Sequence, residues 1–352
     1  MIDAAIARVL TRGRFILGEE VAAFERELAA TVGSAQVVAC ASGTDAIVLA
    51  LLAAGATAQD EVVVPANACV PVLAAVRLAG ARPRLADVDR DTLTLGRSEV
   101  ERVLDPRVRF LLPVHLYGGA ADSDGLARLA KEGGLTLVED CAQSLGAELA
   151  GRKTGSVGKL AAFSFYPTKN LGAYGDAGAV ATNDPALAEK IRQLRQYGWS
   201  RRDFSETEGR NSRMDELQAA ILRAKLPSLE SDNARRREIA DRYDDAFRGL
   251  PLALLSARPG CLPARHLYPV RTSRRDALSQ HLEARGIETA IHYPVPLHLH
   301  PAYRFLGHRK GDFPVSEEAC DSVLSLPIYP TLSEEQQDAV VSGVREFHEG
   351  KA

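Results

Sequence analysis

A single lysine stands where an apolar, strand-like run ends. The run at residues 161–166 stops at Pro167, and Lys169 follows within the stretch FSFYPTKNLGAYGDAG. The chain has 43 Lys and Arg residues in total, of which only eight are lysines. An amine can lose its proton and attack a carbonyl carbon, whereas a guanidinium keeps its charge. Lys169 therefore indicates amine chemistry, with a solvent-facing loop lysine as the alternative.

A second stretch, Ser42-Gly43-Thr44, joins a strand-like run to a long apolar helical pattern. The first turn of a helix has free N–H groups and the positive end of the helix dipole, so it suits a phosphate. Gly43 would let an anion approach the backbone closely. Ser and Thr are also common helix caps. The stretch by itself fits both a phosphate site and an ordinary cap.

The third stretch is LTLVEDCAQ, where four apolar residues run into Glu139 and Asp140. In open α/β sheets, ligands bind at the carboxyl ends of the strands. An acid at this place could hold a protonated ring nitrogen or a metal ion. It could equally be a solvated strand end or a helix cap.

Together the three stretches meet the needs of pyridoxal phosphate, because Lys169 follows Asp140 by 29 positions (169 − 140) and a phosphate cradle precedes both. A lysine forms the imine with this cofactor, an acid keeps its pyridine nitrogen protonated, and a helix N-terminus holds its phosphate. Ser164, in the strand-like run before Lys169, is a further candidate for a phosphate contact.

Strand-like and helix-like runs alternate over residues 36–198. Short apolar strands separated by amphipathic helices predict an α/β fold with a mostly parallel sheet covered on both faces. The strands are expected at residues 36–42, 60–66, 82–89, 110–116, 135–141, 159–166 and 177–183. The helices are expected at 44–55, 71–80, 97–104, 123–134 and 185–198, and the third of these has the capping-box spacing at Ser98 and Glu101.

The second half of the chain has a different pattern. Residues 212–248 read as helical, and Pro227 is expected to kink or divide this run. A smaller α+β region follows, with strands expected at 266–272 and 289–294 and a helix at 274–287. Two helices close the chain, the last with capping-box spacing at Ser333 and Gln336. We expect a large domain at residues 1–235 and a small α+β domain at 236–352.

Composition excludes several classes of protein. Hydrophobic residues make up 46% and charged residues 25% of the chain, a normal globular balance. A net charge of −3 gives no strong attraction to nucleic acid or to anionic membranes. No apolar run approaches the roughly 18 residues of a membrane span. Five scattered cysteines without a CxxC pair favour a reducing cytoplasm.

Other ligand sites find little support. The stretch GRKTGSVGKL has Lys153 where a phosphate-binding loop needs glycine, and Leu160 where it needs Ser or Thr. No G-x-G-x-x-G follows a predicted strand, which argues against a dinucleotide site. His292, His298 and His300 cluster in HYPVPLHLH, but no acid or cysteine stands near them in the sequence. No metal is expected.

Nine segments of the chain resemble, in order, segments of the DegT–StrS family of fold-type-I, pyridoxal-phosphate-dependent sugar aminotransferases. The resemblance covers nearly the whole chain. The segments are GRFILGEEVAAFE, SGTDAIVLAL, DEVVVPAN, PVHLYG, VEDCAQSLGA, FSFYPTKNLGAYGD, GRNSRMDELQAAILRAKL, AIHYPVPLH and VLSLPIYP.

The resemblance implies a role for each matching position around the cofactor. Lys169 would be the Schiff-base lysine and would move the proton between the substrate and the cofactor. Asp140 would pair with the pyridinium nitrogen, and Gln143 would lie near the ring hydroxyl. The phosphate would be held by Gly43, Thr44 and Ser164.

The same resemblance implies a homodimer with shared active sites. Asn211, in GRNSR, would reach the phosphate in the neighbouring subunit. His292 and Tyr293 match a segment that faces the sugar. His115 and Tyr117 in HLYG would lie near the site, or would serve only to pack a strand end.

Members of the family move an amino group from an amino acid, usually glutamate, to a keto group of a nucleotide-activated deoxysugar. The opening GRFILGEEV most resembles members that aminate the 3- or 4-position. Three alternatives stay open: an aminotransferase acting on cyclitols or other keto compounds, a sugar dehydratase, and a non-catalytic regulator. Lys169 argues against the dehydratases in which histidine replaces the lysine.

The chain departs from the family pattern at the cofactor ring. A Thr-aromatic pair usually supplies a ring that stacks on the cofactor, and the matching pair here is Ala68-Cys69. Either Cys69 packs on the cofactor with less contact, or another group stacks on it. The usual GDGG is GDAG, so that Ala177 adds a methyl group to a tight turn.

Overall fold

The computed structural model describes residues 1–350. Its centre is a seven-stranded sheet in the order β1-β9-β8-β5-β4-β2-β3. Strand β9 is antiparallel to β1 and to β8, and every other neighbouring pair is parallel. The predicted mostly parallel α/β sheet is therefore confirmed. The strands are β1 Gln36–Cys40, β2 Glu61–Pro65, β3 Arg82–Ala86, β4 Val108–Leu111, β5 Thr136–Asp140, β8 Leu160–Ser164 and β9 Gly178–Thr182.

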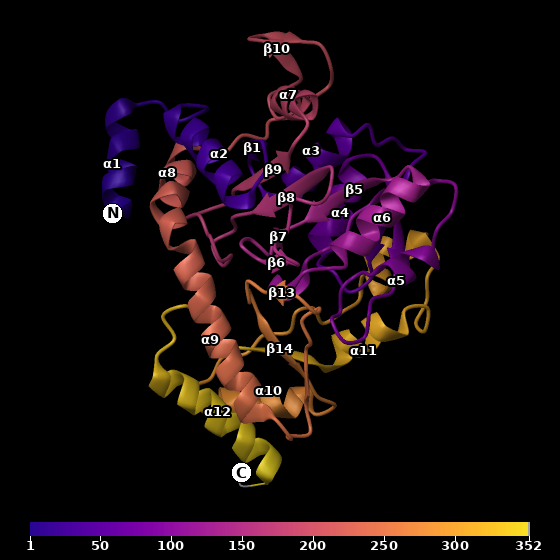
Figure 1. Cartoon of the computed structure of the whole chain (residues 1–352), viewed down its shortest axis with the longest axis vertical. Helices are drawn as coiled ribbons and strands as arrows, with labels where there is room; N and C mark the ends of the chain where they lie inside the picture. Colours follow the sequence, from indigo (N-terminus) through magenta and orange to yellow (C-terminus); the bar gives the residue numbers. More distant parts are fainter. Residues whose placement is uncertain (351–352) are drawn as a thin grey trace.

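Alternate residues of these strands face two different apolar cores, as the two-residue period of a strand requires. In β8, Leu160 and Ala162 belong to one core, whereas Ala161 and Phe163 belong to the other. Helices cover both faces of the sheet (Figure 1). These helices are α2 Glu19–Val32, α3 Gly43–Ala53, α4 Val70–Leu78, α5 Arg97–Glu101, α6 Ser123–Gly133, α7 Pro185–Leu194 and α8 Glu216–Lys225. Helix α1, Ile2–Arg12, packs on the outer side of α8 in a small apolar cluster of its own.

The long helix α9, Leu229–Phe247, connects the sheet to the C-terminal part of the chain (Figure 1). A 3₁₀ turn at Leu226–Ser228 separates it from α8, so Pro227 divides the helical run as predicted. Leu229 packs in a core of the large sheet, whereas Ile239 and Phe247 pack in a third core. The boundary expected between residues 235 and 236 thus falls inside one continuous helix.

The third core lies beneath a small antiparallel sheet of β12, β14 and β15. The elements of this part are β12 Ala253–Leu254, β14 Tyr268–Arg271, α10 Arg275–Glu283, α11 Pro314–Ser322, β15 Val323–Leu326 and α12 Glu334–Glu349. The connection before α11 packs back on the large sheet, because Leu297, Tyr303 and Phe313 belong to its core.

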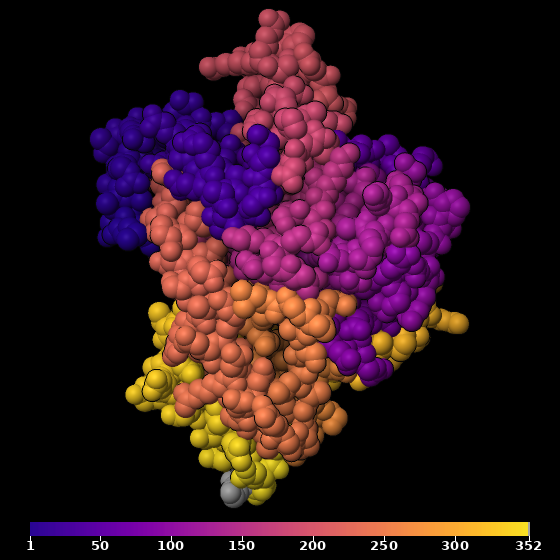
Figure 2. All heavy atoms as spheres, viewed as in Figure 1, coloured from indigo at the N-terminus to yellow at the C-terminus, as the bar shows by residue number. Residues whose placement is uncertain are grey.

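The remaining elements are short. A hairpin of β10 Trp199–Arg201 and β11 Phe204–Ser205 projects from the top of the molecule (Figures 1 and 2). A second small sheet joins β6 Glu148–Leu149, β7 Arg152–Lys153 and β13 Cys261–Leu262. Short 3₁₀ helices span Leu116–Gly118, Leu297–Leu299 and Pro301–Leu306. None of the helices over residues 1–350 combines the length and apolar character of a membrane span.

Two local predictions are wrong. The capping box at Ser98 and Glu101 does not form, because the helix is capped at Gly96 and the Ser98 hydroxyl donates to Glu99 instead. The strand expected at residues 289–294 is reduced to one bridge between Ala290 and Ser325, since the prolines that follow cannot donate to a ladder. The capping box at Ser333 and Gln336 is confirmed.

Candidate active site

A cavity of about 400 Å³, here called the cradle, lies where strands β1, β5 and β8 end. These three strands run in one direction, so their carboxyl ends meet at one edge of the sheet. Seven of the residues singled out in the sequence line this cavity. They are Gly43, Thr44, Cys69, Asp140, Ser164, Lys169 and Tyr293.

The N-terminus of α3 forms one wall of the cradle. Ser42 is its N-cap, and the Ser42 hydroxyl accepts the backbone N–H of Asp45 at 3.1 Å. Within the described chain, the N–H groups of Gly43 and Thr44 have no hydrogen-bond acceptor. The capping interpretation and the phosphate interpretation of this stretch are therefore compatible, because one amide is capped and two remain for an anion.

Asp140 is the last residue of β5 and is almost fully buried. Burial raises the pKa of its carboxyl, while the Ala142 N–H and the Lys169 charge act in the opposite direction. The N–H of Ala142, at 2.9 Å, is its one hydrogen-bond donor among the described residues. A buried carboxylate with so few donors gains most from a cationic partner. A protonated ring nitrogen in the cradle would fit this need.

Lys169 lies at the opening of the cradle, just after β8, and its backbone N–H donates to Tyr166. Burial lowers the pKa of its amine, and the neighbouring Cys69 and Asp140 partly offset this effect. A lysine with a lowered pKa is more often in the neutral, nucleophilic form at neutral pH. The cradle therefore combines an activated amine, a buried acid and free helix amides, and these groups fit pyridoxal phosphate.

Cys69 occupies the N-cap position of α4 at the cradle wall, without a capping hydrogen bond from its side chain. Burial raises the pKa of its thiol to about 11, so the group is neutral at physiological pH. The aromatic rings that line the cradle instead are those of Tyr166 and Tyr293. Neither tyrosine is at the family's usual aromatic position, and only Tyr293 was singled out in the sequence.

Gln143 fixes the position of Tyr293 through a hydrogen bond. Its amide Nε2 donates to the Tyr293 hydroxyl at 3.0 Å, and its Oε1 accepts the Tyr117 N–H at 2.6 Å. The Tyr117 hydroxyl in turn donates to the carbonyl of His292. Gln143 itself does not line the cradle. The structure thus places Gln143 and Tyr117 one layer behind the cavity wall.

Asn211 lies outside the cradle and is exposed. Its two neighbours are fixed by Asp45 in the first turn of α3. The Ser212 hydroxyl donates to Asp45 at 2.8 Å, and Arg210 forms an ion pair with the same carboxylate at 3.3 Å. The segment is therefore anchored beside the cradle of its own chain while the Asn211 side chain faces solvent.

A second cavity, of about 900 Å³, adjoins the cradle at Tyr166, Lys169 and Tyr293. His292 lines it, with Nδ1 at 2.9 Å from the Ser325 hydroxyl. His266, which was not singled out in the sequence, lies in the same wall.

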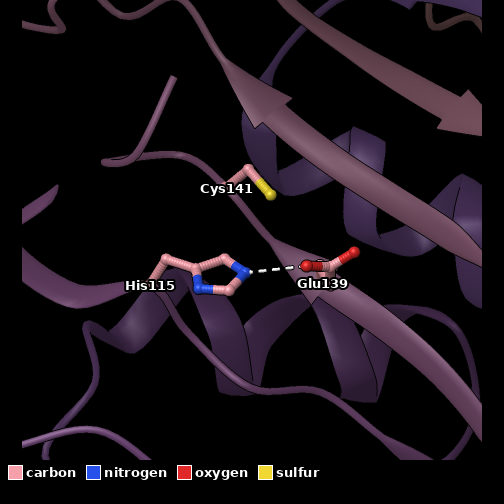
Figure 3. A group of neighbouring side chains, drawn as sticks. All are labelled: His115, Glu139 and Cys141. Carbon is pink, nitrogen blue, oxygen red and sulfur yellow. Dashed lines mark hydrogen bonds and ion pairs between the residues drawn. The ribbon is translucent and has the colours of Figure 1, made fainter. Parts of the chain in front are cut away.

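His115, Glu139 and Cys141 form a buried cluster at the end of β5 (Figure 3). Their potential ligand atoms are within 4.8 Å of one another, but the donor atoms are already engaged. His115 Nδ1 accepts the Ala121 N–H, so Nε2 carries the hydrogen and donates to Glu139 at 3.1 Å. Glu139 also accepts three backbone N–H groups, from residues 155, 157 and 158. We therefore assign this cluster a structural role: its hydrogen bonds fix the end of β5.

The sequence overlooked some cradle residues that stand next to those it singled out. Tyr166 follows Ser164 by two positions, and Asp176 belongs to GDAG. The position of each within its motif was the only signal in the sequence. Their side chains become relevant only when the strand ends are placed together.

The sequence matches the DegT/DnrJ/EryC1/StrS aminotransferase family over residues 1–345. The chain belongs to this family. As a family member it is a pyridoxal-phosphate-dependent sugar aminotransferase, which confirms the predicted reaction class, cofactor and fold class.

Individual relatives are similar over almost their whole length. The chain is 48% identical over 348 residues to dTDP-3-amino-3,4,6-trideoxy-alpha-D-glucose transaminase of Streptomyces venezuelae, covering 99% of this chain and 92% of that one. It is 41% identical to UDP-N-acetyl-3-dehydro-alpha-D-glucosamine 3-aminotransferase of Acidithiobacillus ferrooxidans, covering 98% and 93%. The crystal structure of S. venezuelae DesV in complex with a ketimine intermediate superimposes with a TM-score of 0.97 at 48% identity, covering 99% and 94%.

Proposed function

We propose that this aminotransferase moves an amino group from L-glutamate to the 3-keto group of a nucleotide-activated deoxysugar. The observation that carries the mechanism is the meeting of Lys169 and Asp140 in one cavity with the N-terminus of α3. The 3-position is supported by the two relatives described above, because one is named for a 3-amino sugar and the other as a 3-aminotransferase of a 3-dehydro sugar. A dTDP-sugar is the first candidate acceptor, since the relative with 48% identity is named for a dTDP-sugar.

When bound, pyridoxal phosphate supplies an electron sink for negative charge at the carbon that bears the nitrogen. Lys169 would hold the cofactor covalently through its Nζ, with loss of water from the carbonyl group, and its amine would take the proton from the α-carbon of the donor once it is free again. Burial favours both roles because it lowers the pKa of this amine. Asp140, which is buried, would hold a proton on the ring nitrogen of the cofactor. The amides of Gly43 and Thr44 and the hydroxyl of Ser164, which line the cradle, would bind the phosphate.

Tyr293 has a positioning role in this proposal. The Gln143 hydrogen bond fixes its ring at the border of the two cavities, where it would cover the cofactor in place of an aromatic residue at position 69. His292, in the adjoining wall, faces the sugar. His292 and Tyr293 thus belong to the C-terminal part of the chain, but in this proposal they serve a site at the edge of the large sheet.

We also propose a homodimer in which Asn211 contacts the phosphate of the neighbouring subunit. Support comes from its exposure and from the projecting hairpin beside it, which carries the exposed ring of Phe204. Residues 1–235 and 236–352 would form the large and small domains. A cytoplasmic location is supported by five cysteines that are all unpaired.

The first experiment is an absorption spectrum of the protein loaded with pyridoxal phosphate, recorded before and after adding L-glutamate. A visible band that disappears, with release of 2-oxoglutarate, would establish the donor half of the reaction. Lys169→Ala is the matched control and should show neither the original band nor turnover. A band that persists would contradict glutamate as the donor. The acceptor is then identified by offering dTDP- and UDP-linked 3-keto and 4-keto sugars to the aminated enzyme.

A further inference from the structure

The second cavity holds a buried histidine beside the reactive lysine. His266 is only 7% exposed and lines this cavity together with Lys169 and His292. It stands just before β14, in the C-terminal part of the chain. Its Nδ1 lies 3.0 Å from the Oδ1 of Asn170, the residue that follows Lys169. A contact 96 positions apart in the sequence therefore joins the histidine to the backbone that carries the lysine.

Two backbone carbonyls fix the orientation of the side-chain amides of Asn170 and Asn233, which support this contact. Asn170 Nδ2 donates to the carbonyl of Ala264 at 2.8 Å and to Asn233 Oδ1 at 2.7 Å. Asn233 Nδ2 donates to the carbonyl of Leu145 at 2.9 Å. A carbonyl oxygen can only accept, so neither amide can be turned over without placing oxygen against oxygen. Asn170 Oδ1 must therefore be the atom that faces His266.

These orientations determine the tautomer of His266. Asn170 Oδ1 can only accept, so Nδ1 of His266 carries the hydrogen and donates it. In the neutral ring, Nε2 is then left with a lone pair. Nε2 has no hydrogen-bond partner among the described residues and is not fully buried. It therefore contacts the open space of the second cavity.

The surroundings keep the ring neutral. Burial lowers the pKa of His266 well below its usual value, and the charges of Lys169, Arg236 and His292 act in the same direction. Arg236 also donates to the carbonyls of Arg265 and His266, at 3.4 and 3.3 Å, and so fixes the backbone at this point. The other charged groups around the cavity are Lys225, Asp232 and Glu288.

We propose that His266 is a positioning residue for Lys169: its Nε2 lone pair accepts a hydrogen bond from the lysine ammonium whenever that group is free. The inference rests on Lys169 being the reactive lysine of the proposed function. The amine must leave the cofactor when a substrate nitrogen takes its place, and it must then stay close enough to move a proton. A fixed acceptor in the adjoining cavity holds it there, and no proton transfer to His266 is needed.

Two substitutions separate this role from a structural one. His266→Asn keeps a donor for Asn170 at the place of Nδ1 but removes the Nε2 acceptor. His266→Gln keeps an acceptor near the place of Nε2 but removes the donor to Asn170. If His266 were only structural, Asn should replace it with little effect on the protein, whereas Gln should disturb it. A positioning histidine gives the opposite order.

The measurement uses the full-length protein stripped of cofactor. Acetic anhydride labels neutral amines, and mass spectrometry follows the rate at Lys169 relative to the exposed Lys310 in the same sample, from pH 6 to pH 10. The acceptor stabilises the ammonium, so His266→Asn should raise the relative rate at neutral pH about fivefold, the equivalent of about 1 kcal/mol of hydrogen bond. At high pH the rates should converge. His266→Gln should follow the wild type.

Wider access to the cavity would raise the rate equally at every pH, and that pattern would overturn the proposal. A folded His266→Asn protein whose profile superimposes on the wild type would overturn it as well. His300→Asn is the matched control, because that imidazole faces the carbonyl of Val295. Failure of the wild type to take nitrogen from glutamate would refute the proposed function, whereas the labelling result needs no cofactor or substrate.

Discussion

Gly43 and Ser164 touch at the floor of the cradle, where the start of α3 meets the end of β8. A Cβ atom at position 43 would lie 2.5 Å from the Ser164 Cβ and 2.8 Å from its hydroxyl oxygen. The sequence had suggested that Gly43 leaves room for an anion. The structure shows that its missing side chain also lets two elements close together, so that helix amides and a hydroxyl face the same cavity.

Gly43→Ala should therefore weaken cofactor binding while leaving the fold intact. The added methyl group must push α3 and Ser164 apart, and overpacking of this kind costs about 1–3 kcal/mol. We expect pyridoxal phosphate affinity to fall at least tenfold, measured by fluorescence titration. Gly119→Ala is a useful control, since its φ of −86° suits any residue and the nearest atom to an added Cβ there, the Leu116 carbonyl oxygen, lies at an ordinary contact distance of 3.7 Å. Unchanged affinity would show that the contact between α3 and β8 does not shape the phosphate site.

Asp140→Asn should separate binding from catalysis. The phosphate contacts are untouched, so the protein should still bind cofactor, but an amide cannot hold a proton on the ring nitrogen. We expect proton removal from glutamate to slow by about 100-fold or more, measured in single turnovers with glutamate deuterated at the α-carbon. Asp241→Asn, at an exposed site on α9, is the control. A rate close to that of the wild type would remove Asp140 from the mechanism.

A mixture of two inactive variants tests the shared active site. Lys169→Ala lacks the amine, and Asn211→Ala lacks the proposed contact across the subunit boundary. A mixed dimer has one complete site only if Asn211 serves the partner subunit. Random mixing should then restore about a quarter of the wild-type activity at limiting cofactor, as expected for a two-fold symmetric dimer. If Asn211 serves its own chain, mixing restores nothing.

Glu139→Gln should change how stability depends on pH. Burial alone would raise the pKa of Glu139, but the hydrogen bonds from His115 and the 155–158 backbone outweigh it and the pKa is lowered. A lowered pKa contributes stability that is present above the usual value of 4.5 and is lost as the pH falls below it. At pH 7 the variant should lose about 2 kcal/mol of unfolding free energy.

The difference between variant and wild type should shrink on acidification from about pH 4.5. Urea titrations at pH 7, 5 and 4 would measure it. Glu230→Gln, on the exposed face of α9, serves as the control. A difference that stays constant over this range would mean that Glu139 is not held as a carboxylate.

The part of the site that the sequence could predict is the part that strand order brings together. Gly43, Asp140 and Lys169 each stand at or just after the end of a strand, and parallel strands place their ends at one edge. A reader of the sequence therefore needs only the fold class to group them. The apolar strand patterns and the turn residues supply that class.

The part of the site that the sequence could not predict depends on how the C-terminal part of the chain packs against the large sheet. Gln143 and Tyr293 are hydrogen-bonded although they lie 150 positions apart in the sequence, and the hydrogen-bonded pair of Asn170 and His266 lies 96 positions apart. No local pattern specifies such contacts, because they follow from packing of two separate cores. For the same reason, the ring that lines the cradle near Cys69 could be identified only from the structure.

The continuous helix α9 has a consequence for protein engineering. Exchanging substrate-facing segments between related sugar aminotransferases is a natural way to alter specificity, and residue 235 would look like a convenient junction. A junction there would cut a 19-residue helix that buries Leu229 in one core and Tyr243 in another. Chimaeras should instead keep α9 and the segments that complete both of its cores from one parent, and the second of these cores extends along the chain to Phe347.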